Sequence, residues 1–369
     1  KNGRPKFFPD YYVIPMSLDK DNDAQEAFNM IDYFKRNGVL VKELKEDTGS
    51  YKKGDLVIDM AQAKRGYANH ILYKGSNESA WAAMYAELLV NFPDMKGFKA
   101  EPVFKDGLFA GKLGEVTTTR ATRTSEIDPK APYYVIANTS ASAVQAVNKV
   151  ISQGKSVYLT DDGYIVDRDT FASLLPNYAI YGEALYKVPN GPTLKPLKIY
   201  SPNYHYDWTG VDAPAHTSLV LEKLGFQIVD TPDEADVIVL ENNRFDASIF
   251  GKKPTLVIGG EAMQKLEKLG VLAGFDAEKL KGGSDYEGLM KAIIDDQDPL
   301  TSGYKKNALF YSNSGNWIEK VPSNFKTLMS IASSDYYIAG WWPKNEVLAN
   351  KVMAISGELL GQPLFVYAG

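Results

Sequence analysis

The polar side chains best suited to chemistry gather in one stretch, which runs from Tyr200 to Ser218. Within it, His205, Asp207 and His216 are residue types that bind zinc or manganese. Their spacing matches no pair of ligands that is typical of a helix or a hairpin. We therefore favour side chains that are solvated or hydrogen-bonded within their own loop, with a metal site as the alternative.

Aromatic residues alternate with these polar ones. Tyr204, Tyr206 and Trp208 could form a platform for a sugar or a peptide, or they could anchor the loop to the core. The stretch follows a predicted strand, and ligands of open α/β sheets bind just beyond the carboxyl ends of strands. The candidate ligand contacts in this stretch are therefore Tyr204, His205, Asp207, Trp208 and His216.

Another candidate, Glu261, lies further along the chain. The residues PTLVIGGEAMQKL, from Pro254 to Leu266, predict a strand, a sharp turn and a helix. This arrangement is similar to the nucleophile elbow of class I glutamine amidotransferase-like folds, in which a cysteine occupies the turn. The chain has no cysteine, and Gly259 and Gly260 supply no hydroxyl, so the resemblance favours the fold and argues against amidotransferase chemistry. Glu261 could bind a ligand or act as a general base, but the helix dipole explains a glutamate in the first helical turn more simply.

Composition excludes several classes of protein. The net charge of -5 and the lack of a long Lys/Arg run argue against a nucleic-acid partner. The sequence contains no run of about 18 apolar residues, which is the length that a membrane-spanning helix needs. The absence of cysteine excludes disulfides and thiolate metal sites.

An internal repeat organises the first half of the chain. The tetrapeptide Tyr-Tyr-Val-Ile occurs at Tyr11–Ile14 and again at Tyr133–Ile136. Each copy precedes a helical pattern that ends on a glycine, from Ala27 to Gly38 and from Ala146 to Gly154, and then a second apolar stretch, VLVKEL or SVYLTD. A strand, a helix and a strand in this order predict a parallel unit, so we expect two related β-α-β modules.

The segment from Lys105 to Lys130 connects these modules, and its alternating Thr and Arg residues are consistent with a loop or an exposed strand. From Leu197 onward, apolar stretches alternate with helical patterns, which predicts a doubly wound, mostly parallel sheet. We expect further helices at Asp285 to Asp295 and around Val347 to Leu360. The predicted fold class is α/β: two β-α-β modules followed by an amidotransferase-like sheet domain, divided as residues 1–104, 105–192 (second module with its connecting segment) and 193–369.

Two segments carry a further resemblance. GDLVIDMAQAKRGYANHIL (Gly54 to Leu72) and ESAWAAMYAELLVNFPDMKGF (Glu78 to Phe98) resemble the region that follows the catalytic domain in large bacterial zinc carboxypeptidases, the M14-like family. That family needs a His-x-x-Glu pair. The histidines of this chain are His70, His205 and His216, and none has a glutamate three residues further on.

The resemblance implies a non-catalytic accessory region of a secreted bacterial metallocarboxypeptidase, located outside the cell or at the cell wall. It implies that the zinc ligands and the catalytic glutamate belong to an N-terminal catalytic domain, which would be the main partner, and that this region itself holds no cofactor. Both ends of the chain look like cuts within a longer protein. The alternatives are a glycan- or peptide-binding module, a hydrolase or transferase that uses a carboxylate base, and a purely structural spacer.

The family-like segments include side chains with two interpretations. Lys64 and Arg65 could contact the catalytic domain or a substrate carboxylate. More simply, Asp59 would cap a helix while Lys64 and Arg65 remain solvated. In ESAWAAMYAELL, the apolar residues from Trp81 to Leu89 recur at spacings of three and four, which predicts a helix that faces a core.

Overall fold

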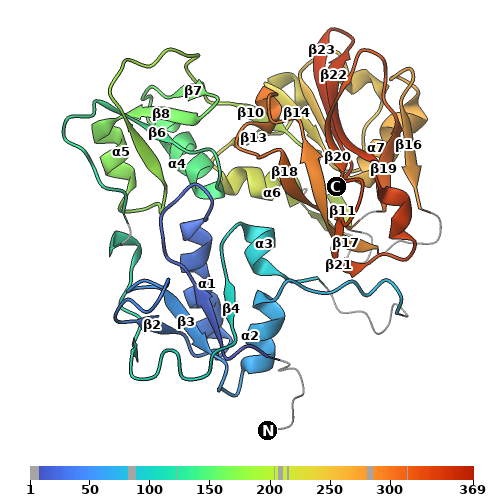
Figure 1. The fold of residues 1–369 in the computed structure, drawn as a ribbon. Coiled ribbons are helices and arrows are strands. Elements are labelled where there is room, and N and C mark those ends of the chain that lie inside the picture. The colour runs from blue at the N-terminus through green and yellow to red at the C-terminus, as the bar shows by residue number, and fades with distance from the viewer. Residues whose placement is uncertain are drawn as a thin grey trace. The chain divides into compact units, whose positions relative to one another are not determined.

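The protein divides into two compact units in a computed structural model (Figure 1). The first unit comprises Lys1–Gly75, Val90–Ala146 and Ser156–Thr193, and the second comprises Ser76–Leu89, Val147–Lys155 and Leu194–Gly369. The structure describes residues 8–81, 89–122, 124–202, 204–206, 211–213, 216–280, 286–313 and 315–369, with the backbone alone at 121, 204–206, 211–213 and 216.

The first module is a five-stranded antiparallel sheet with the strand order β4-β1-β3-β2-β5. The repeated Tyr-Tyr-Val-Ile forms one of its inner strands, with all four residues buried. The elements are β1 (Tyr11–Ile14), α1 (Ala24–Arg36), β2 (Lys42–Leu44), β3 (Leu56–Asp59), α2 (Arg65–Leu72), α3 (Phe92–Lys96), β4 (Glu101–Val103) and β5 (Leu113–Gly114).

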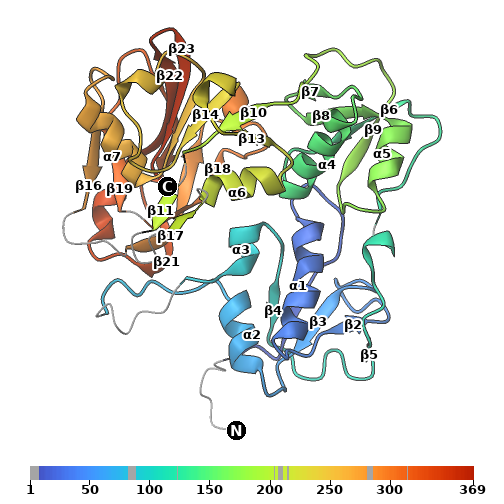
Figure 2. The ribbon, with the colours of Figure 1, turned by 180° about the vertical axis from the view of Figure 1, so that it is seen from behind.

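The second module repeats this plan with the strand order β7-β8-β6-β9. Figure 2 shows α5 beside β6 and β8, the strands that it contacts. The elements are β6 (Tyr133–Ile136), α4 (Ala141–Ser152), β7 (Tyr158–Thr160), β8 (Gly163–Asp167), α5 (Arg168–Leu174) and β9 (Gly182–Leu185).

The prediction that the two strands of each β-α-β unit pair in parallel is wrong in both modules. β3 lies between β1 and β2 and is antiparallel to each, and β8 separates β6 from β7 in the same way. The two strands joined by a helix therefore point the same way without pairing, which is the split β-α-β topology of ferredoxin-like folds. The sequence pattern located the strands and helices of the repeat, but the partner of each strand depends on contacts between distant parts of the chain.

Helix α1 illustrates how local sequence builds the first core. Asp23 caps the helix, because its carboxylate accepts hydrogen bonds from the backbone N–H groups of Gln25 and Glu26. Apolar residues then recur at helical spacing and bury one face of the helix. The buried side chains are Ala24, Ala27, Phe28, Met30, Ile31 and Phe34.

The connecting segment contains the short strand β5 and one helical turn, η2 (Arg120–Thr122), and is otherwise a loop. The alternative of an exposed strand at its Thr/Arg stretch is wrong for the described residues. The part of the segment that follows β5 is anchored by Glu43 on β2. This carboxylate accepts hydrogen bonds from the backbone N–H groups of Thr117 and Thr118 and from the Thr117 hydroxyl.

The second unit is built on a 12-stranded mixed sheet. Its first part is parallel, with the order β13-β10-β14-β15-β23. The strands and helices predicted from Leu197 to Gly270 are found. The elements are β10 (Lys198–Tyr200), β11 (Tyr204–Tyr206), β12 (Val211–Ala213), α6 (His216–Lys223), β13 (Gln227–Val229), η3 (Pro232–Glu234), β14 (Val237–Leu240), η4 (Ala247–Ile249), β15 (Thr255–Ile258) and α7 (Gly260–Leu269).

The remaining part of this sheet is antiparallel. β23 belongs to both parts, since it is parallel to β15 and antiparallel to β22. The elements are β16 (Asp276–Lys279), β17 (Glu287–Ile294), η5 (Pro299–Thr301), β18 (Asn307–Ser312), β19 (Asn316–Lys320), β20 (Lys326–Ile331), β21 (Tyr337–Trp341), η6 (Asn345–Leu348), β22 (Val352–Leu359) and β23 (Gln362–Tyr367).

Two helix predictions are wrong here. The stretch at Asp285 to Asp295 contains β17, and the stretch at Val347 to Leu360 contains the end of η6 and all of β22. In β17 burial alternates from Met290 to Ile294, which is the period of a strand with one buried face. Pairing with strands on both sides outweighs the helical preference of these short segments.

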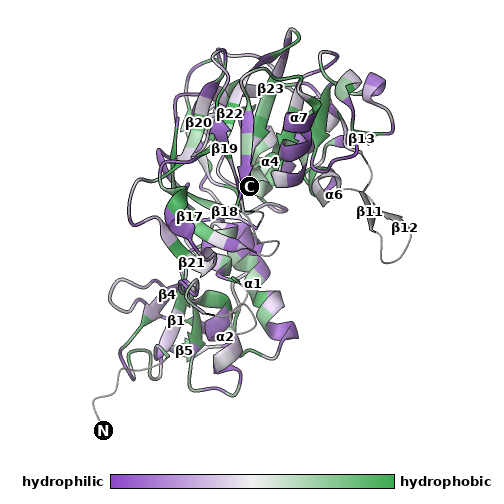
Figure 3. Ribbon diagram, turned by 90° about the vertical axis from the view of Figure 1, so that its right-hand side faces the viewer, coloured by the Kyte–Doolittle hydropathy of each residue, from purple (hydrophilic) through white to green (hydrophobic). Residues whose placement is uncertain are grey.

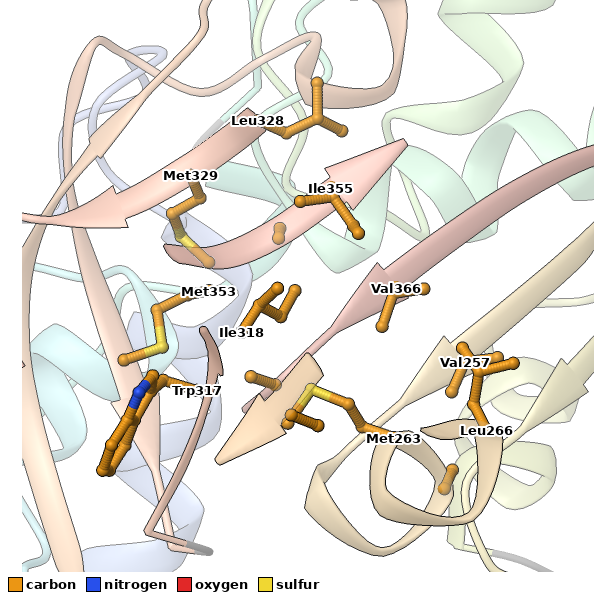
Figure 4. Packing of buried hydrophobic residues seen from close by; sticks show 14 of the residues in the cluster. Val257, Met263, Leu266, Trp317, Ile318, Leu328, Met329, Met353, Ile355 and Val366 are labelled. Carbon is orange, nitrogen blue, oxygen red and sulfur yellow. The ribbon is translucent and has the colours of Figure 1, made fainter. Parts of the chain in front are cut away.

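The core of the second unit joins helix α7 to both parts of the sheet. Figure 4 shows Leu266 of α7 beside Val257 of β15, with Val366 of β23 nearby, and all three are fully buried. Helix α7 also carries hydrophilic residues, coloured purple in Figure 3, and its Glu261 and Lys268 are exposed. The helix therefore has one apolar face against the sheet and one polar face.

The segment Ser76–Leu89 also belongs to the second unit. Its backbone extends the sheet at β21, because Gly340 donates to the carbonyl of Ser76 and accepts from the N–H of Glu78, both at 2.9 Å. Trp81 is 62% exposed and does not face a core, and residues 82–88 of the helix predicted there lie outside the described part of the chain.

Candidate functional site

The carboxyl edge of the parallel strands contains the best-defined group of polar residues. In chain order the strands lie as 2-1-3-4, an order found in flavodoxin-like folds, with β10 as strand 1 and β14 as strand 3. The order reverses between these two strands, and ligands of open α/β sheets bind at such a switch point. Ser201 follows β10, and Glu241 and Asn242 follow β14.

Glu241 is bound to the beginning of helix α6. One carboxylate oxygen, Oε2, accepts hydrogen bonds from the backbone N–H of Thr217, at 2.8 Å, and from the Thr217 hydroxyl. The N-terminus of a helix favours negative charge, so this carboxylate takes the place that a phosphate or carboxylate of a ligand would prefer. The other oxygen, Oε1, accepts no hydrogen bond from the described residues and is available as an acceptor.

Glu261 lies at the turn between β15 and α7. Gly259 occupies that turn with φ = 88°, a left-handed conformation that favours glycine. The chain thus has the sharp strand-turn-helix geometry that the sequence predicted. The Glu261 carboxylate accepts a hydrogen bond of 2.5 Å from the Asn243 amide, which joins the loop after β14 to the start of α7.

Ser201 and Asn242 contain buried polar atoms without partners. Their exposed fractions are 6% and 2%. The Asn242 Oδ1 accepts from the N–H of Arg244 at 2.9 Å, but neither its Nδ2 nor the Ser201 Oγ has a hydrogen-bond partner within the described structure. Buried polar groups in native proteins are nearly always hydrogen-bonded, so both atoms require an explanation.

Only part of the predicted site lies within the described residues. Tyr204 and His205 lie in β11, where His205 pairs through its backbone with Asp212, and His216 begins α6, but their side chains fall outside the described residues. Asp207 and Trp208 lie outside the described residues altogether. The predictions for these five side chains remain predictions, as does the alternative of a hydrolase or transferase that uses a carboxylate base.

The sequence did not single out Glu241, Asn242 and Asn243, and it did not single out Ser201 within the stretch from Tyr200 to Ser218. The available signal was their position, because Ser201 directly follows LKIY and ENN directly follows VIVL, both at predicted strand ends. Their significance depends on burial and on missing partners, which a sequence does not show.

The other predicted polar residues have structural contacts. Asp59 does not cap α2, which begins at Arg65; its carboxylate instead accepts from the N–H of Ala61. Lys64 and Arg65 are exposed, as the simpler interpretation predicted, and the Arg65 guanidinium lies 5.3 Å from the centre of the Phe8 ring.

Neither a metal centre nor a membrane span is found among the described residues. They contain no group of three His, Cys, Asp or Glu side chains that could hold a metal ion. Within the same residues, no helix has the length and apolar character that crossing a membrane requires.

No protein-family profile and no curated protein matches this chain. Among solved structures, similar chains include a GMP synthase subunit from Thermoplasma acidophilum (17% identity, 47% of this chain and 83% of that chain, TM-score 0.31). Others are a glutamine amidotransferase from Thermotoga maritima (10% identity, 46% and 74%, TM-score 0.29) and a ThuA-like protein from Parabacteroides merdae (10% identity, 47% and 79%, TM-score 0.30). The α/β description of the second unit rests on its strand pairings.

Proposed function

We propose that this chain is a non-catalytic accessory region of a secreted, bacterial, zinc carboxypeptidase-like protein. Its parent would remove C-terminal residues from peptides or from cell-wall peptide stems, outside the cell or at the cell wall. The zinc would belong to the catalytic domain that precedes this region. The region itself would pack against that domain, shape its cleft or hold it near a peptide or cell-wall glycan.

The observation that best supports a non-catalytic role is the chemistry of the elbow after β15. A nucleophile elbow presents a cysteine or serine on its turn, whereas this turn has Gly259 and Gly260. The acidic groups at the same edge hold the fold together, since Glu261 binds Asn243 and Glu241 binds Thr217. Carboxylates fixed in this way stabilise loops and a helix terminus.

The test compares the full parent protein, its catalytic domain and this chain. We expect about one zinc per molecule in the parent and in the catalytic domain, and carboxypeptidase activity in both. This chain should hold no stoichiometric zinc and release no C-terminal residues from the same peptides. Adding it in trans to the catalytic domain should change KM or thermal stability.

Two results would contradict the proposal. One is peptide cleavage by this chain alone, which would move attention to His205, Asp207 and His216. The other is a parent protein without zinc, which would reject the carboxypeptidase relationship.

A further inference from the structure

The two side chains with partnerless atoms follow neighbouring strands at the carboxyl edge of the sheet. β10 and β14 are neighbouring parallel strands, and Tyr200 is in register with Ile238. Ser201 therefore lies beside Val239 of β14. Asn242 comes three residues after Val239, just beyond the end of β14.

The loss of folding stability caused by these two partnerless atoms indicates that they bind a ligand. A buried polar atom without a hydrogen-bond partner destabilises the folded state, because it has lost its hydrogen bonds to water. Ser201→Ala would remove this destabilisation, because the hydroxyl has no partner within the described structure. Binding sites keep such groups because a ligand supplies the missing hydrogen bonds.

The surrounding charges define the ligand chemistry. Asn242 Nδ2 is a donor, the Ser201 hydroxyl is a donor and an acceptor, and Glu241 keeps Oε1 as an acceptor. Glu241 and Glu261 repel an anionic ligand, and the positive end of α6 is already occupied by Glu241. Hydroxyl groups both donate and accept, so a neutral ligand with several hydroxyls matches all three groups.

We propose that the switch point between β10 and β14 is a binding site for a neutral, polyhydroxylated ligand of saccharide class, held by Ser201, Asn242 and Glu241. The ligand takes a hydrogen bond from the Asn242 amide, exchanges one with the Ser201 hydroxyl and donates one to Glu241. The site does not depend on the proposed relationship to carboxypeptidases.

The test is a calorimetric titration of the whole chain with glucose, N-acetylglucosamine and chitotriose, beside a neutral tripeptide and inorganic phosphate as competing chemistries. We expect saturable binding of at least one saccharide and none of phosphate. Ser201→Ala and Asn242→Asp should each weaken saccharide binding about tenfold or more, which corresponds to about 1.4 kcal/mol.

Thermal unfolding of the free variants separates a ligand site from a structural one. Ser201→Ala should unfold at the same temperature as the wild type or higher. The matched control is Thr255→Val on β15, whose buried hydroxyl donates to the carbonyl of Lys253 at 3.0 Å. It should lower the unfolding temperature and leave saccharide affinity unchanged.

Several results would overturn the proposal. They are the absence of saturable saccharide binding, tripeptide or phosphate binding in its place, and saccharide binding that both site variants leave unchanged. A Ser201→Ala variant destabilised as much as Thr255→Val would also overturn it, because the hydroxyl would then hold a structural water.

Discussion

At the scale of single residues, Glu43 shows how a buried carboxylate is kept ionised. Its exposed fraction is 4%. Burial by itself disfavours the charged form, but hydrogen bonds from Thr118, Thr117 and Lys45 outweigh burial and lower the pKa of Glu43 to about 2. The charged carboxylate fixes Thr117 and Thr118 of the connecting segment against β2.

Glu43→Gln should lower the free energy of unfolding of the first unit at pH 7 by about 1–3 kcal/mol, because it weakens charge-assisted hydrogen bonds. Because folding lowers the pKa of Glu43, its ionised carboxylate stabilises the fold fully above the unfolded-state pKa near 4.5. This stabilisation is lost as the pH falls toward 2 and the carboxylate becomes protonated. The difference between wild type and variant should therefore shrink over that range in urea unfolding monitored by circular dichroism. Glu115→Gln, at an exposed partner of Lys42, is the control and should change little. A difference that stays constant from pH 7 to pH 3 would refute this account.

At the scale of elements, Gly340 determines how closely β21 approaches β17. It has φ = 111°, and a Cβ atom there would lie 2.2 Å from the carbonyl oxygen of Glu287. The same residue pairs with the backbone of Ser76 and Glu78. Gly340 thus allows β21 to pair with both β17 and the segment Ser76–Leu89.

Gly340→Ala should destabilise the second unit by about 1–3 kcal/mol and increase amide hydrogen exchange in β21 and at Glu78. The control, Gly361→Ala, also has a positive φ, 76°, but nothing lies within 4 Å of its Cβ position. It tests backbone strain without the clash and should cost less. Equal effects of the two variants would show that steric contact with Glu287 is unimportant.

At the scale of the whole molecule, each unit has its own hydrophobic core. Phe34 belongs to the cluster around α1 and β1, and Leu266 to the cluster around α7 and β15, and the two clusters share no residue. All five tryptophans, at positions 81, 208, 317, 341 and 342, fall within the ranges of the second unit. Tryptophan fluorescence therefore reports on the second unit alone.

Leu266→Ala should lower the midpoint of the tryptophan transition, with a loss of about 2–5 kcal/mol, because it leaves a cavity under α7. Phe34→Ala should leave that midpoint unchanged while it lowers the stability seen by circular dichroism, by about 3–5 kcal/mol. Coincident shifts of both signals in both variants would mean that the units unfold as one cooperative structure.

Local sequence determined which segments become strands and helices wherever the pattern was long and regular. The repeated Tyr-Tyr-Val-Ile forms β1 and β6, and the strand, turn and helix around Gly259 are found as predicted. The type and end of such an element depend on periodicity, caps and turn residues, which a short stretch of sequence contains.

Only the tertiary structure decided the pairing of strands and the state of the polar groups. Whether β1 pairs with β2 or with β3, and whether residues 287–294 form a helix or a strand, depends on partners distant in the chain. The same holds for the site. Ser201 and Asn242 are ordinary polar residues in the sequence, and they become candidates for ligand binding because folding buries them at a switch point without partners for Oγ and Nδ2 within the described structure. Burial and hydrogen bonding are properties of assembled neighbours, so no local pattern of residues encodes them.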